Sequence, residues 1–126
     1  MYGDGRTWAT CSKGSDVLSD GWYLAEGSTA GGMETWVLVQ NPGDESVHVN
    51  LVFHTGEGEK VIPELQNVEI PAKHRRNFKL NDYLTTYEVS TMVTCEDGAV
   101  VVERAMYGDG RTWAHASGGY VPFTPF

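Results

Sequence analysis

Nine consecutive residues, MYGDGRTWA, occupy positions 1–9 and recur without change at positions 106–114, an offset of 105 in a chain of 126 residues. A segment that holds Met, Tyr, Arg and Trp does not repeat by chance. Repetition at a fixed period is typical of structural modules arranged in tandem. The chain is therefore predicted to hold one period of a tandem array, plus an end that overlaps the neighbouring period.

Composition limits the classes of protein that the chain can belong to. A hydrophobic fraction of 40% excludes a disordered tail and suffices for one domain with a core. A net charge of −8 argues against nucleic acid as a partner, because phosphate binding needs clustered cations. No run of 18 apolar residues occurs, so no membrane span is expected.

Short strands separated by turn residues are predicted along most of the chain. Residues 46–55 alternate apolar and polar, which is typical of a half-buried strand. Residues 34–40 are apolar on both faces and predict a central strand, with Trp36 in the core. Further strands are expected at 22–26, 66–71, 75–80, 87–95 and 99–107, the last two joined as a hairpin at Glu96-Asp97-Gly98.

This spacing predicts an all-β, antiparallel, immunoglobulin-like β-sandwich of about seven strands, and a small barrel stays as the main alternative. The sandwich module is expected to span residues 22–107. Residues 1–21 are interpreted as the end of a preceding repeat and its connector, and residues 108–126 as the connector to the next repeat.

Several blocks resemble a family of bacterial repeats. They are WYLAEGST and VLVQNP within residues 22–42, and ERAMY at 103–107. Members of that family are β-rich modules found in tandem in large secreted or surface-anchored proteins, with no established biochemical activity. The resemblance implies an extracellular or cell-surface location and a non-catalytic role. The chain departs from the usual pattern after ERAMY, where GDGRTW stands at residues 108–113.

The two cysteines, Cys11 and Cys95, suggest a disulfide, since even counts are typical of secreted modules. Such a bond would join the preceding junction to the module body. Two unpaired thiols and an intermolecular bond stay as alternatives.

The duplicated segment marks the junction between modules and is the predicted site of contact between copies. Three aromatic or basic positions in each copy are expected to form this interface: Tyr2, Arg6, Trp8, Tyr107, Arg111 and Trp113. Plain linkers in a covalent array, or strand addition between subunits, would both use it. An overlap of domain boundaries without a function stays as a third alternative.

A basic stretch at residues 73–79 is a second candidate interface. Four of its residues could dock an acidic neighbour such as another copy: Lys73, Arg75, Arg76 and Lys79. The simpler alternative is a solvated strand face that pairs with nearby glutamates.

Evidence for chemistry is weak. Ser, His and Asp occur without a nucleophile elbow, a P-loop or a zinc-type spacing, so no enzyme activity, cofactor or catalytic residue is expected. Calcium held by acidic loops between modules stays as an alternative. The sequence predicts an extracellular structural repeat that forms a stalk or filament by head-to-tail contacts, or alternatively an adhesive or carbohydrate-binding module with a surface glycan or protein ligand.

Overall fold

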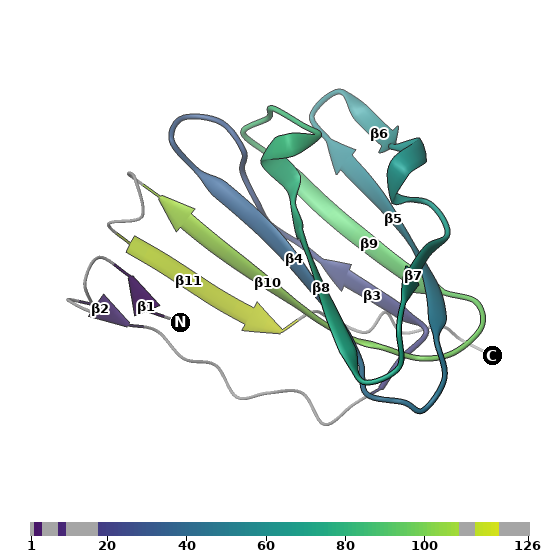
Figure 1. Ribbon diagram of the computed structural model, residues 1–126. Helices are drawn as coiled ribbons and strands as arrows, with labels where there is room; N and C mark the ends of the chain where they lie inside the picture. The colour runs from purple at the N-terminus through teal and green to yellow at the C-terminus, as the bar shows by residue number, and fades with distance from the viewer. Residues whose placement is uncertain (1, 4–7, 10–17, 109–112, 119–126) are drawn as a thin grey trace.

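A computed structural model describes residues 2–3, 8–9, 18–108 and 113–118 of the chain. Its strands form two antiparallel sheets and one short separate pair (Figure 1). The separate pair consists of β1 (Tyr2–Gly3) and β2 (Trp8–Ala9). Two short 3-10 helices, η2 (Pro63–Leu65) and η3 (Leu80–Asp82), join strands. Within the described residues no helix is long and apolar enough to cross a membrane.

The four-stranded sheet has the order β11-β10-β4-β8. Its strands are β4 (Glu34–Asn41), β8 (His74–Lys79), β10 (Val101–Gly108) and β11 (Trp113–Gly118). The five-stranded sheet has the order β3-β9-β5-β6, and β7 also pairs with β5. Its strands are β3 (Gly21–Leu24), β5 (Val47–Thr55), β6 (Gly58–Val61), β7 (Val68–Ile70) and β9 (Val89–Cys95).

The core lies between the two sheets. Along β5 every second side chain is buried, and β9 and β4 show the same alternation. Alternation of this kind arises because successive side chains of a strand point to opposite faces. The predicted all-β antiparallel sandwich is confirmed, and the largest fully buried side chains include Trp22, Leu51, Phe53, Ile70 and Leu80.

The predicted position of Trp36 is wrong. Thr35, Val37, Val39 and Asn41 are the buried residues of β4, so Trp36 lies on the outer face of the four-stranded sheet, where it is half-buried. The apolar run misled the prediction because both faces of β4 carry apolar side chains. The central place of β4, between β10 and β8, is as expected.

The predicted hairpin between the last two strands of the body is also wrong. β9 pairs with β3 and β5, whereas β10 pairs with β4 and β11, so residues 96–98 carry the chain from one sheet to the other. Each strand buries one apolar face, which carries Val93 in β9 and Val102 in β10. Because the two strands belong to different sheets, these faces pack against each other across the core. The Asp-Gly pair therefore serves a crossing between sheets instead of a hairpin.

The segment expected to be a connector contains a strand of the sandwich. β11 pairs antiparallel with β10, from Glu103↔Gly118 to Gly108↔Trp113. The complete sandwich therefore includes residues 113–118, beyond the boundary at 107 that the sequence suggested.

Trp22 is the largest fully buried side chain and also joins the two sheets. Its indole Nε1 donates to the carbonyl oxygen of Val100, the residue before β10, at 2.8 Å. Replacing Trp22 by Phe removes this bond and part of the core volume, so we expect the free energy of unfolding in urea to fall by about 1–3 kcal/mol. The matched control is Trp36→Phe on the outer face, for which we expect a smaller loss. Equal losses in the two variants would contradict this assignment of Trp22.

Candidate functional site

The segment that follows β3 crosses from one sheet to the other, and several hydrogen bonds hold it in place. Val89 N–H donates to the Gly27 carbonyl at 3.0 Å, and Thr35 Oγ1 donates to the Ser28 carbonyl at 2.7 Å. The Thr29 N–H donates to the Thr86 carbonyl at 2.8 Å. Buried backbone groups are costly without partners, so these bonds let the chain cross the end of the core.

Gly27 is closely packed at this crossing. A Cβ atom there would lie 3.0 Å from Val89 Cγ1 and 3.1 Å from Thr35 Cγ2, so a larger residue would need these two side chains to shift. The glycine of the EGST motif therefore lets the chain pass close to both side chains.

Arg104 of β10 holds the same segment. Its guanidinium Nη1 donates to the carbonyl oxygen of Glu26, and the residue is only 8% exposed. Burial lowers the pKa of Arg104, and the charge of the Glu26 carboxylate partly offsets that effect. The arginine of the ERAMY block and the glutamate of the WYLAEGST block thus meet in space.

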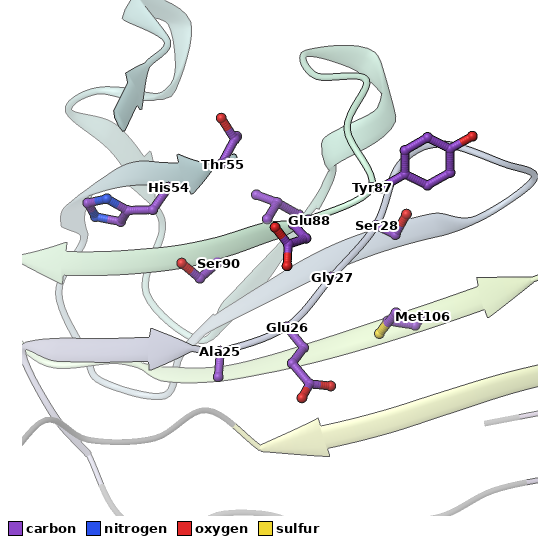
Figure 2. A pocket seen from close by; sticks show the side chains of 11 residues that line it. Ala25, Glu26, Gly27, Ser28, His54, Thr55, Tyr87, Glu88, Ser90 and Met106 are labelled. Carbon is purple, nitrogen blue, oxygen red and sulfur yellow. The ribbon is translucent and has the colours of Figure 1, made fainter. Parts of the chain in front are cut away.

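A surface hollow of about 560 Å³ opens above this crossing. Figure 2 shows the carboxylates of Glu26 and Glu88 and the hydroxyl of Ser90 between His54 on one side and Tyr87 on the other. The Tyr87 side chain is 77% exposed and lies against Gly31, whose φ of +65° favours glycine. The hollow therefore has an aromatic rim and an acidic, hydroxyl-bearing floor.

These residues come from three separate parts of the chain, and no sequence pattern identified them as a site. Glu26 and Ser28 follow β3, His54 lies near the end of β5, and Tyr87 and Glu88 precede β9. No spacing rule connects such positions, since only the pairing of β3 and β5 with β9 brings them together. Within residues 18–108 no group of three or more His, Cys, Asp or Glu side chains is arranged to hold a metal ion.

Of the six predicted interface residues, only Tyr107 has a described side chain, and it is half-buried on the outer face of β10. Tyr2, Trp8 and Trp113 lie on β1, β2 and β11, of which only the backbone is described. Arg6 and Arg111 lie outside the described residues.

Lys73 directly precedes the edge strand β8, and the other three basic residues of the stretch lie on that strand. Lys73 Nζ donates to the Pro42 carbonyl at 2.9 Å and lies 3.2 Å from an Asp44 carboxylate oxygen. At the other end of the stretch, Lys79 lies 3.8 Å from a Glu34 carboxylate oxygen and 5.9 Å from the centre of the Trp36 ring. Both lysines therefore have partners at the surface of the same copy.

The two arginines of the stretch are different. Arg75 and Arg76 are exposed, and neither makes an ion pair with another described residue. Arg76 lies over the Phe78 ring at 5.3 Å. Among the described strands β8 pairs only with β4, so its outer edge is open and cationic.

Cys95 has a free, buried thiol, and Cys11, its predicted partner, lies outside the described residues. Burial raises the pKa of the Cys95 thiol, and the nearby charge of Asp97 adds to the rise. The disulfide stays a prediction, and the structure gives Cys95 the character of an unreactive core residue.

Asp97 holds the crossing between β9 and β10 against β5. Its carboxylate accepts from the His48 N–H at 2.8 Å and lies 2.8 Å from His48 Nδ1. These hydrogen bonds lower the pKa of Asp97 from 3.8 to about 2.

We expect Asp97→Asn to change how stability depends on pH. Because the folded-state pKa is lowered, the ionised carboxylate stabilises the fold above pH about 4, and this contribution is lost as pH falls through about 2. The difference in unfolding free energy between wild type and variant, measured in urea from pH 2 to 5, should therefore grow between pH about 2 and 4 and then level off. A difference that does not vary with pH would contradict the role assigned to Asp97.

Comparison with family models gives no match, and comparison with curated proteins gives none either. Solved structures with the same fold are found. A crystal structure of Thermotoga maritima 1070 has a TM-score of 0.71 at 17% identity, over 82% of this chain and 95% of that one. The Anabaena sensory rhodopsin transducer has a TM-score of 0.58 at 23% identity, over 70% of this chain and 96% of that one. This chain therefore shares its β-sandwich fold with both proteins.

Proposed function

We propose that the chain is one period of a non-catalytic, extracellular structural array whose modules contact each other head to tail. The location comes from the family resemblance of the sequence. The head-to-tail arrangement is supported by the way in which the duplicated segment folds.

Both copies of the duplicated segment make the same strand pair. In the first copy Tyr2 pairs with Ala9 and Gly3 with Trp8, and in the second Tyr107 pairs with Ala114 and Gly108 with Trp113. Each of these positions differs from its counterpart by the period of 105 residues. The β1–β2 pair therefore corresponds to the tip of a β10–β11 hairpin, and this observation carries the proposal.

The position of the β1–β2 pair is consistent with a junction. β1 lies close to β11, at the edge of the four-stranded sheet (Figure 1). The equivalent hairpins of successive periods would then lie near one another where two modules meet. Modules that contact their neighbours in this way stabilise each other along the array.

Glycan binding is a second candidate function, and the hollow favours it. Sugars present apolar faces to aromatic rings and hydroxyls to carboxylates, and the hollow offers an exposed Tyr87 ring beside Glu26, Glu88 and Ser90. An adhesive module would use this hollow without any contact between copies.

Self-association of the purified full chain tests the proposed function. We expect the sedimentation coefficient to rise with protein concentration, and negative-stain electron microscopy to show rods at the highest concentrations. A chain that remains monomeric throughout would contradict the proposal. If, in that case, oligosaccharides shift the amide resonances of residues 87–90, the second candidate is favoured.

A further inference from the structure

The outer face of the five-stranded sheet carries a row of four apolar side chains, one from each successive strand. Val61 of β6 pairs with Val52 of β5, Val52 with Met92 of β9, and Met92 with Tyr23 of β3. Val61 is 51% exposed and the other three are half-buried. Three strand spacings make this apolar row roughly 14 Å long.

An apolar row is unexpected on this face. The outer face of an antiparallel sheet in a sandwich usually carries polar side chains, and the residues on both sides of the row do so. On one side lie Glu59, His54 and Ser90, and on the other lie Asn50 and Thr94. A contiguous and partly exposed apolar row with a polar rim is a candidate surface for binding another protein.

The rim of the apolar row is acidic at one end. Glu59 stands two residues from Val61 on the same face of β6, and the exposed Glu57 and Glu88 lie near the same end of the sheet. Of these three glutamates, only Glu57 forms an ion pair with another described residue, with Lys60 Nζ at 3.8 Å. The occupant of this face is therefore expected to combine apolar surface with exposed positive charge.

The outer face of the four-stranded sheet has this combination. Leu38 and Val101 are half-buried there, and Arg75 of the edge strand β8 stands opposite Gln40 on the same face. A shallow hollow of about 30 Å³ lies among them, lined by Leu38, Gln40, Arg75, Val101 and Glu103. That volume holds roughly one or two methyl groups.

We propose that the outer face of the five-stranded sheet binds the outer face of the four-stranded sheet of a second copy. Val61 packs into the hollow beside Leu38 and Val101 of the second copy, and Glu59 pairs with its Arg75. This contact is additional to the hairpin junction of the proposed function and, like that junction, requires copies of the chain to associate.

This contact has a definite consequence for assembly. The two surfaces are different, so each copy keeps one free surface of each kind after it has bound a neighbour. Such a heterologous contact adds copies in one direction unless its rotation closes a ring. The sheets of two copies bound in this way would lie face to face at about 10 Å, the spacing of packed sheets.

Charge reversal on each surface of the full chain tests the pairing. Glu59→Arg should place a second guanidinium against Arg75 of the neighbouring copy, and Arg75→Glu should place a second carboxylate against Glu59. We expect each variant alone to self-associate roughly tenfold or more weakly than wild type in sedimentation equilibrium, because opposed like charges are strongly unfavourable at an interface. In an equimolar mixture, the unchanged Glu59 of one variant can meet the unchanged Arg75 of the other, and the two introduced charges are also opposite, so association should be regained.

The control is Glu96→Arg, which makes the same charge change at an exposed position in the crossing between β9 and β10 and should leave association unchanged. Val61→Asp tests the apolar part and should also weaken association. Circular dichroism establishes that each variant is folded.

The outcomes separate this inference from the proposed function. If the wild-type chain never associates, both the inference and the proposed function are contradicted. Wild-type chain that associates, with variants at positions 59, 61 and 75 that associate equally well, overturns only the inference. Weakened single variants whose mixture does not recover would also overturn the pairing of Glu59 with Arg75.

Discussion

The sandwich depends on how the chain passes from one sheet to the other at the end of the core. The backbone of residues 26–29 has to leave β3 and reach β4 beside buried side chains, and there its polar groups would otherwise lose their partners. Thr35, Thr86, Val89 and Arg104 supply those partners from strands and loops far apart in the sequence. The crossing fixes the two sheets relative to each other, and it also forms the floor of the surface hollow.

The same dependence explains why part of the fold could be predicted from the sequence and part could not. Residues 47–53 alternate so regularly that only one face of β5 can be buried. The turn at Asp97 has a sequence that suits a hairpin, yet its carboxylate binds the backbone of His48 on another strand. Sequence pattern states which face of a strand is buried, but not which sheet the next strand joins. Trp36 shows a related limit. Because both faces of β4 carry apolar residues, the sequence alone does not show which face is in the core.

The candidate sites follow the same rule. The cationic edge strand could be found from sequence because Lys73, Arg75, Arg76 and Lys79 lie close together along the chain. The structure divides them into two lysines with local partners and two arginines without an ion pair among the described residues. The hollow and the apolar row could not be found, because each is assembled across strands by pairing in the sheet. The alternation of polar and apolar positions within one strand does not show which side chains will be neighbours on the four paired strands.

The duplicated segment and the two outer faces lead to one account, in which copies of the chain contact each other directly, along the array at the hairpin junction and elsewhere through the outer sheet faces. The unfolding of a chain of two successive periods tests this claim most directly, compared with the single period in the same buffer. Coupled modules should unfold in one transition at a higher temperature than the single period, because each stabilises its neighbour. Two modules that unfold at the temperature of the single period would show that they are independent, and would contradict the account.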